Sequence, residues 1–410
     1  MFELEPIIFE LSNGIRVVYQ KKEAFVAHLG VMIFAGSRFE QPEEEGLAHF
    51  IEHCIFKGTK KRKAFDIFTD LDSVGGELNA YTNKEEICVH ASFRKAHFSI
   101  ASELLADIVQ NASFPEDEIQ KEKEVVLDEI ISYMDSPIER IFDDFEAKLF
   151  KKNSLGYNTL GTKKTVKSFT RKNLKDYLKR FFIPTNMVIS FVGGISVDEL
   201  RNTLEADFGS FKGEGNAPEA HPLNKIKTFK NRAKKSNFQT HTIIGGIAPS
   251  YHSDDRRAMT LLTNVLGGPA LNSRLTLSVR EKHGYAYNIE ANYNTYTDIG
   301  FWSVYMGTDK KYLEKALKLI YAEFDLIRNK KLTKIELSQA KEQLKGHIAL
   351  SLDSNLELMF SLAKSIMIHN KIDSVNEIYE QIDTINVDEV HSTAQKYFGE
   401  DQLSELVYEF

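Results

Sequence analysis

The second half of this chain repeats the first half. The residues at 241–250, H-T-I-I-G-G-I-A-P-S, echo those at 28–37, H-L-G-V-M-I-F-A-G-S. Farther along, residues 336–348 lie over residues 118–130 at an offset of 336 − 118 = 218. The full length of 410 residues is also too long for one ordinary core and suits two domains of about 200 residues each. The repeat therefore predicts a tandem duplication of one folding unit.

Each half contains segregated strand and helix patterns, which predict an α+β unit. Asn13-Gly14 stands between two strand-like runs and predicts a hairpin. A Gly- and Pro-containing stretch with almost no large apolar residues, 209–224, predicts the linker between domains. We therefore expect a first domain over 1–208, this linker, and a second domain over 225–410. The further predicted elements of the first half are strands over 26–35 and 77–93 and helices over 64–74, 95–112, 115–134 and 138–151.

The stretch 46–58, G-L-A-H-F-I-E-H-C-I-F-K-G, contains a candidate metal site. Apolar residues recur at helical spacing, and three acids at 43–45 precede them, where a helix dipole favours negative charge. In a helix, His49 and His53 lie one turn apart on one face, with Glu52 beside them. Paired imidazoles are preferred zinc ligands, and a neighbouring carboxylate can act as a base toward a zinc-bound water. The alternative is two hydrogen-bonded histidines on a half-buried helix.

A zinc site needs a third protein ligand, and an acid-rich helix predicted over 115–134 offers candidates. Glu122 and Glu129 are seven residues apart, which is two helical turns, so they share a face. The other glutamates of this segment, Glu116, Glu118 and Glu124, are expected to form a solvated acidic face. The basic run 57–63 is expected to be a solvated loop.

The order of these residues resembles the inverzincin zinc metallopeptidases, the family of pitrilysin, insulin-degrading enzyme and the mitochondrial processing peptidase. The resemblance rests on H-F-I-E-H at 49–53, a glutamate 129 − 53 = 76 residues later, and a second glutamate seven residues before that one. It implies that His49, His53 and Glu129 bind one Zn²⁺ per chain. It also implies that Glu52 is the general base and that Glu122 supports the site.

The resemblance extends over nearly the whole chain and implies further roles. The stretch G-G-E-L-N-A-Y-T is similar to the family's edge strand, on which Asn79 and the Ala80 backbone would hold an extended substrate. The chain departs from the family after this point, at I-C-V-H-A-S-F. Arg280 and Tyr287 resemble an Arg/Tyr pair that reaches the active site from the second domain and stabilises the oxyanion. An exposed Arg280–Glu281 pair and a packed tyrosine are the alternative.

The second half lacks the metal ligands. At the offset of 218, Ala340 takes the place of Glu122 and His347 that of Glu129, and the segment 254–268 contains no histidine. The resemblance therefore implies an α+β fold of two tandem α/β-roll domains, similar to the mitochondrial processing peptidase, in a clamshell arrangement that closes about 209–224. It also implies a homodimer, because two-domain relatives pair to enclose a chamber.

Composition limits the other classes of function. The net charge of −7 is spread along the chain, so a nucleic-acid partner is not expected. No apolar run reaches the length of a membrane span, and the N-terminus lacks the positive charge of a signal peptide, so we expect a cytoplasmic protein without a membrane partner. Cys54 and Cys88 are the only cysteines, and Cys54 is expected to be a small core residue.

The sequence thus predicts a zinc-dependent endopeptidase, similar to processing peptidases, that hydrolyses peptide bonds in unfolded or short polypeptides. Two other functions stay open. One is a non-catalytic peptide-binding or scaffold subunit of a heteromeric processing peptidase. The other is a zinc hydrolase of small molecules.

Overall fold

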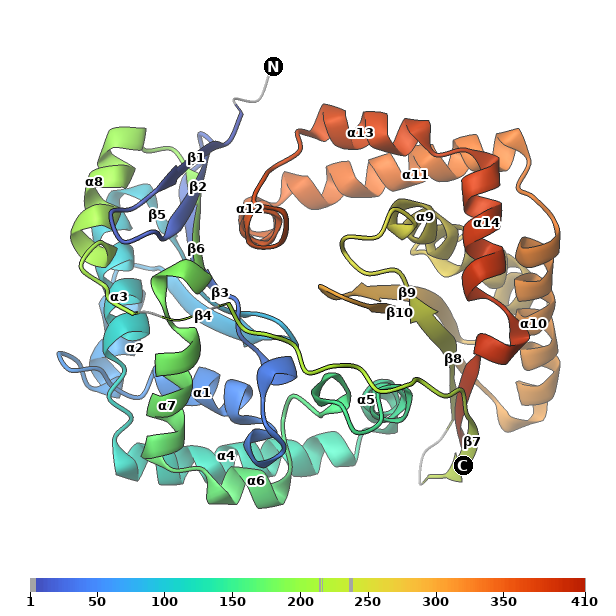
Figure 1. Cartoon of the computed structure of the whole chain (residues 1–410), viewed down its shortest axis with the longest axis horizontal. Coiled ribbons are helices and arrows are strands. Elements are labelled where there is room, and N and C mark those ends of the chain that lie inside the picture. Colours follow the sequence, from blue (N-terminus) through green and yellow to red (C-terminus); the bar gives the residue numbers. More distant parts are fainter. Residues whose placement is uncertain (1–4, 214, 216, 236–238, 410) are drawn as a thin grey trace. The chain divides into compact units, whose positions relative to one another are not determined.

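The chain folds into two compact units, each built around one β-sheet (Figure 1). The computed structural model describes residues 5–213, 215, 217–235 and 239–409. The first unit comprises residues 1–132, 153–222 and 350–372, and the second comprises 133–152, 223–349 and 373–410. The chain therefore passes between the units five times, after residues 132, 152, 222, 349 and 372. The domain ranges expected from the sequence treat each half as one continuous stretch, whereas these units are interleaved.

The first unit contains a six-stranded sheet with the order β1-β2-β6-β3-β5-β4. The expected hairpin is present, because β1 and β2 pair antiparallel on either side of Asn13-Gly14. Only β2 and β6 pair in parallel, and β4 forms an edge. The strands are β1 (Ile7–Glu10), β2 (Arg16–Lys21), β3 (Val26–Ile33), β4 (Glu77–Thr82), β5 (Ile87–Arg94) and β6 (Met187–Gly193).

Both faces of this sheet are apolar, and different helices cover them. Alternate strand residues such as Val17 and Val31 join the main core, which includes residues of α1 and α3. Their neighbours Val18 and Met32 point the opposite way and pack against Met359 and other residues of α12 (Asn355–His369). The other helices of this unit are α1 (Leu47–Ile55), α2 (Ala64–Asp72), α3 (Phe98–Asn111), α4 (Glu116–Met134), α6 (Lys163–Ser168), α7 (Arg171–Phe181) and α8 (Val197–Phe208).

The second unit contains a five-stranded sheet with the order β7-β11-β8-β10-β9. Its only parallel pair is β7 with β11, which matches the parallel pair of the first sheet. The strands are β7 (Lys230–Lys234), β8 (Thr240–Ala248), β9 (Asn288–Thr295), β10 (Gly300–Thr308) and β11 (Ser404–Glu409). The helices are α5 (Pro137–Leu149), α9 (Arg256–Gly267), α10 (Leu313–Asn329), α11 (Lys334–Asp353), α13 (Val375–Thr384), α14 (Val387–Tyr397) and the π-helix η6 (Thr276–Glu281).

Each half of the sequence contributes one helix to the sheet of the other half. Helix α5 comes from the first half but packs on β8 and β11 of the second sheet, where Phe142 stacks near Tyr305 with ring centroids 5.1 Å apart. Helix α12 comes from the second half and packs on β2, β3 and β6 of the first sheet. The starts of α4 and α11 differ by 334 − 116 = 218, and those of α5 and α12 by 355 − 137 = 218. The α+β class and the tandem duplication are thus confirmed.

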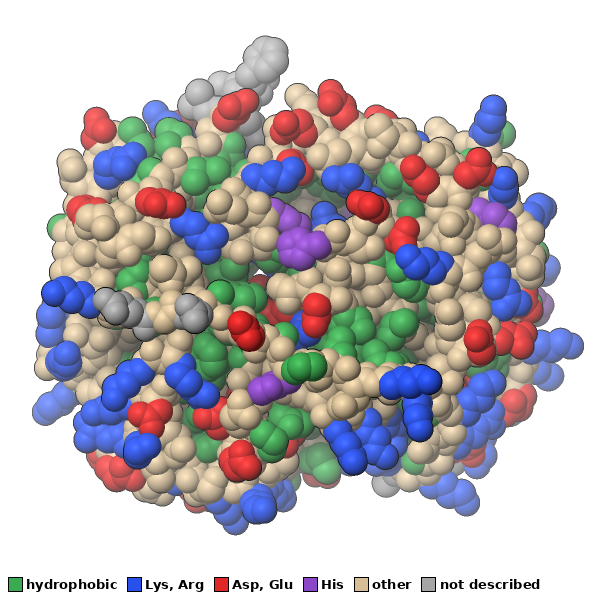
Figure 2. Space-filling model, in the orientation of Figure 1, with side chains coloured by type: hydrophobic (Ala, Val, Ile, Leu, Met, Phe, Trp, Pro, Cys, Tyr) green, Lys and Arg blue, Asp and Glu red, His purple; other side chains and the backbone are tan. Residues whose placement is uncertain are grey.

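Both acidic and basic side chains are spread over the face that Figure 2 shows. Among the described residues, none of the helices is long and apolar enough to span a membrane.

Cys54 and Cys88 are both buried free thiols, so Cys54 is the core residue that the sequence predicts.

Candidate metal centre

Helix α1 carries His49, Glu52 and His53, and local contacts fix where it begins. Gly46 precedes the helix with φ of 92°, and a Cβ there would lie 2.5 Å from the backbone of Gly161. The buried carboxylate of Glu40 accepts hydrogen bonds from the backbone N–H groups of Gly46 (2.9 Å) and Ala48 (2.7 Å). Glu40, rather than the three acids at 43–45, therefore accepts the hydrogen bonds of the free N–H groups at the N-terminus of the helix.

Helix α4 brings Glu129 to the two histidines. Oε2 of Glu129 lies 3.7 Å from Nε2 of His49 and 3.5 Å from Nε2 of His53. Among the described residues, these three form the one set of side chains whose donor atoms could share a metal ion, all within 4.8 Å of one another. Tetrahedral zinc with bonds of 2.0–2.1 Å separates its ligands by about 3.4 Å. Glu129 Oε2 is buried without a hydrogen-bond donor, so the three side chains fit a zinc ion.

The charges around this cluster shift its pKa values in opposite directions. Burial, helped by the neighbouring His53, lowers the pKa of His49 to about 4. Burial acts in the same sense on His53, but the carboxylates of Glu122 and Glu129 outweigh it and raise its pKa to about 9. The contact with His53 holds the pKa of Glu129 below its usual range. His49 is thus ready to bind a metal as neutral imidazole, whereas His53 must give up a proton to do so.

Glu52 lies on helix α1, next to His53 in the sequence. It is half-buried, and burial raises its pKa above the usual value of a glutamate. A carboxylate with a raised pKa accepts and returns protons more readily near neutral pH than an ordinary surface glutamate. Glu52 thus lies close enough to His53 and Glu129 for their charges to act on its pKa.

Glu122 lies behind His53 and has two partners. Its Oε2 atom is 3.2 Å from Nδ1 of His53, and its Oε1 atom is 2.8 Å from Nζ of Lys57. Burial by itself raises the pKa of Glu122, but the bonds to His53 and Lys57 outweigh it and lower the pKa. Glu116 and Glu124 are exposed, as expected, and Glu118 is half-buried and pairs with Lys121.

The basic run 57–63 is only in part the solvated loop that the sequence predicts, because Lys60, Lys61 and Lys63 are exposed whereas Lys57 and Arg62 are half-buried. Lys57 pairs with Glu122, as described above. Arg62 pairs with Asp70 (2.7 Å), Asp107 (2.8 Å) and Glu103. Spacing along the chain does not reveal these pairs because the acids come from α2, α3 and α4, at separations of up to 65 residues (122 − 57).

Asn79 and Ala80 lie on the edge strand β4, which packs near α1. The Asn79 side chain is exposed, and its Oδ1 atom accepts a hydrogen bond from the backbone N–H of Ala80 (3.0 Å). On its inner side β4 pairs with β5, with Asn79 opposite His90. The position fits an edge that could accept another strand.

Arg280 and Tyr287 belong to the second unit. Arg280 lies in the π-helix η6, and its Nε atom is 3.5 Å from Oε1 of Glu281. Tyr287 is exposed and donates a hydrogen bond to Asp309 (3.2 Å). The tyrosine is therefore not packed, while the arginine forms the weak surface pair considered as the alternative.

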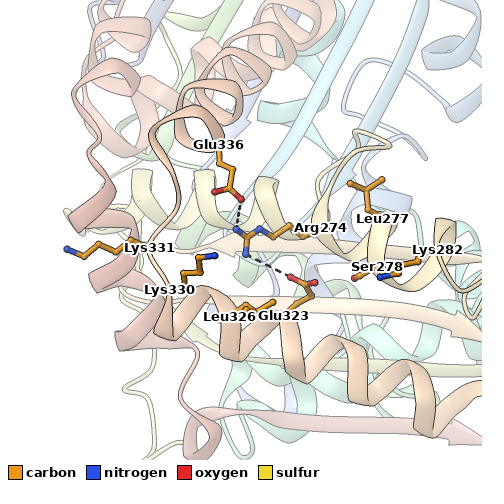
Figure 3. A pocket seen from close by; sticks show the side chains of 9 residues that line it. All are labelled: Arg274, Leu277, Ser278, Lys282, Glu323, Leu326, Lys330, Lys331 and Glu336. Carbon is orange, nitrogen blue, oxygen red and sulfur yellow. Dashed lines mark hydrogen bonds and ion pairs between the residues drawn. The ribbon is translucent and has the colours of Figure 1, made fainter.

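A pocket in the second unit lies between η6, α10 and the start of α11 (Figure 3). Its volume is about 370 Å³. Arg274 extends into it and pairs with Glu336 (2.8 Å) and Glu323 (3.9 Å), as the dashed lines show. Four cationic side chains and two carboxylates line it, and none of its lining residues belongs to the cluster of metal donors found among the described residues. This pocket therefore does not compete with the cluster on α1 and α4 as a candidate catalytic site.

Comparison with known proteins shows which family the chain is similar to. Residues 16–163 match the family described as insulinase (peptidase family M16), and residues 168–344 match the peptidase M16 inactive domain. An uncharacterized zinc protease of Bacillus subtilis is 34% identical over 405 residues, which cover 97% of each chain. An uncharacterized zinc protease of Rickettsia felis is 31% identical and covers 98% of this chain and 97% of its own.

Solved structures share the fold. The crystal structure of a protease from Helicobacter pylori superposes over 100% of both chains with a TM-score of 0.92 at 21% identity. A peptidase M16 inactive domain from Pseudomonas fluorescens gives the same TM-score of 0.92 at 18% identity and covers 99% of this chain and 98% of its own. At these identities the likeness concerns the fold alone.

Proposed function

Because the chain belongs to the insulinase family, peptidase family M16, we propose that it is a zinc-dependent endopeptidase that hydrolyses peptide bonds in unfolded or short polypeptides. The observation that carries the proposal is the triangle of donor atoms from His49, His53 and Glu129. The buried Glu129 oxygen has no hydrogen-bond donor, and it faces two imidazole nitrogens at the distances that shared zinc ligands require. We propose one Zn²⁺ per chain at this point.

A zinc ion held by His49, His53 and Glu129 would supply Lewis-acid chemistry toward a peptide carbonyl and a water molecule. Glu52 takes the proton of that water and passes it to the leaving amine. Its half-buried position raises its pKa, which suits both steps. Glu122 accepts a hydrogen bond from Nδ1 of His53, which leaves Nε2 of that ring free to bind the metal.

We propose that the substrate lies along β4 as an added strand, held by Asn79 and the backbone of Ala80. An edge strand beside α1 supports this role. We also propose that Arg280 and Tyr287 of the second domain donate to the oxyanion when the two domains close in a clamshell motion. Both side chains are exposed on their own unit and so can take a new partner.

We further propose a homodimer and a cytoplasmic location. The resemblance to two-domain relatives supports the first, and two buried free thiols suit a reducing compartment. The alternative is a non-catalytic peptide-binding or scaffold subunit of a heteromeric processing peptidase. The complete donor set and the adjacent Glu52 favour the enzyme.

The test is zinc content together with cleavage of a long unstructured peptide by the full chain. The wild type is compared with Glu52→Gln, and with Glu124→Gln as a control, because Glu124 is exposed on α4. We expect all three to bind one zinc per chain. The Glu52→Gln variant should lose about 10²- to 10⁴-fold in rate, and Glu124→Gln should match the wild type.

The other outcomes discriminate the alternatives. If the wild type binds zinc but cleaves no peptide, the function as a non-catalytic subunit replaces the enzyme. If it binds no zinc, the assignment of the donor triangle is wrong. If it cleaves only small esters or amides, a small-molecule hydrolase is correct.

A further inference from the structure

Lys57 follows the metal-binding helix and turns back toward the site. Helix α1 ends at Ile55, and the backbone N–H of Lys57 donates to the carbonyl of Cys54 (3.1 Å). Its ammonium group lies 2.8 Å from Oε1 of Glu122. The side chain of Glu122 is 8% exposed and that of Lys57 is 22% exposed. This pair is therefore shielded from water far more than the Lys61–Glu103 pair of the same loop, whose side chains are 62% and 36% exposed.

Glu122 divides its two oxygens between two partners. Oε1 faces Lys57, and Oε2 lies 3.2 Å from Nδ1 of His53. A carboxylate can only accept hydrogen bonds, so Nδ1 carries a hydrogen, and Nε2 is the ring nitrogen that gives up its proton when a metal binds. Nε2 of the same ring is 3.5 Å from the Glu129 oxygen, at the proposed metal position. The contacts thus run from Lys57 through Glu122 to His53 without a gap.

The ammonium is held on a second side by an aromatic ring. Nζ of Lys57 lies 5.7 Å from the centre of the Phe68 ring, and that ring packs near Phe56 with centroids 6.5 Å apart. A cation over an aromatic face is attracted by the ring quadrupole. Glu122 and the Phe68 ring together restrict the rotamers of Lys57. The ammonium group, held in this way, in turn fixes the orientation of the Glu122 carboxylate.

We propose that Lys57 is a positioning residue for the metal ligand His53 and that it acts through Glu122. The inference rests on the proposed function only in that His53 binds zinc. Without the ammonium, one oxygen of a buried carboxylate loses its partner, and Glu122 is free to rotate away from Nδ1. The imidazole then loses the contact that fixes its orientation and tautomer, which weakens metal binding.

The test measures the Zn²⁺ affinity of the full chain by competition with a chromophoric chelator, so it does not depend on peptidase activity. The variants are Lys57→Met, Lys57→Arg, Glu122→Gln and the double variant Lys57→Met/Glu122→Gln. Lys61→Met is the control, because Lys61 lies in the same loop, is 62% exposed and pairs only with Glu103 among the ion pairs described.

We expect Lys57→Met and Glu122→Gln each to weaken zinc binding by about 10- to 100-fold. Lys57→Arg should restore part of the affinity, because it keeps the charge and the donors. The double variant should bind no more weakly than Glu122→Gln alone, because Lys57 acts through Glu122. Lys61→Met should bind as the wild type does.

Two results would overturn the proposal. One is wild-type affinity in Lys57→Met, and the other is a double variant whose loss equals the product of the two single losses. If Lys57→Met does not fold, Lys57→Arg and Lys57→Gln replace it in the same comparison. Zinc binding that follows the expected pattern in a protein without peptidase activity would refute the proposed enzyme but not this role of Lys57.

Discussion

Gly30 on β3 gives a sharp test of how α12 holds the first unit together. A Cβ at this position would lie 2.4 Å from Sδ and 3.0 Å from Cε of Met359. Ordinary contacts between heavy atoms are about 3.5–4.0 Å, so the thioether would have to move by roughly 1 Å. Met359 is fully buried in the layer between α12 and the sheet, so it has no open space to move into.

We predict that Gly30→Ala destabilises the protein by about 1–3 kcal/mol, the usual cost of an overpacked core. Met359→Ala should cost about 2–5 kcal/mol, because it leaves a cavity under α12. In the double variant the new methyl group fills part of that cavity and meets no thioether. Its cost should therefore fall short of the sum of the single costs by about 1–3 kcal/mol.

The measurement is urea unfolding of the zinc-free chain followed by circular dichroism, with hydrogen exchange of β3 and β6 to localise the effect. Gly346→Ala is the control, because Gly346 lies in α11 and a Cβ there would have no neighbour within 4 Å. This control should be neutral or stabilising by up to about 1 kcal/mol. Wild-type stability in Gly30→Ala, or strictly additive costs in the double variant, would show that the packing argument is wrong.

Three further predictions concern charged groups. Burial raises the pKa of Glu40 to about 8, so its contribution to stability is present below the unfolded pKa near 4.3 and is lost as the pH rises through 8. Glu40→Gln should therefore gain stability relative to the wild type between pH 5 and pH 8, by at most about 1.4 kcal/mol per pH unit. An equal difference in the free energy of unfolding at both pH values, measured in urea, would contradict this. Arg62→Ala leaves the buried Asp107 without its ion-pair partner and should cost roughly 3–5 kcal/mol in the same assay, whereas Lys61→Ala should stay within about 0.5 kcal/mol. Arg280→Ala should lower kcat/KM for a peptide by about 10²- to 10³-fold without changing zinc content, and an unchanged rate would remove Arg280 from the mechanism.

The sequence by itself determined the parts of this protein that depend on local spacing. The i, i+4 spacing of His49 and His53 puts both imidazoles on one face of any helix, and α1 is that helix. The repeat at an offset of 218 predicted the duplication, because equal spacing of apolar residues builds equal elements. The approach of Glu129 to the histidines was implied by the family resemblance, not by spacing.

The tertiary structure alone decided the contacts between residues far apart in the chain. Glu40 caps α1, Lys57 pairs with Glu122, and Arg62 joins three acids from other helices. Charge pairs of this kind leave no periodic signal, because any exposed lysine and glutamate would look the same in the sequence. The exchange of α5 and α12 was equally hidden. An amphipathic helix shows which of its faces must be buried, but only the folded chain shows that an apolar sheet face of the other half receives it.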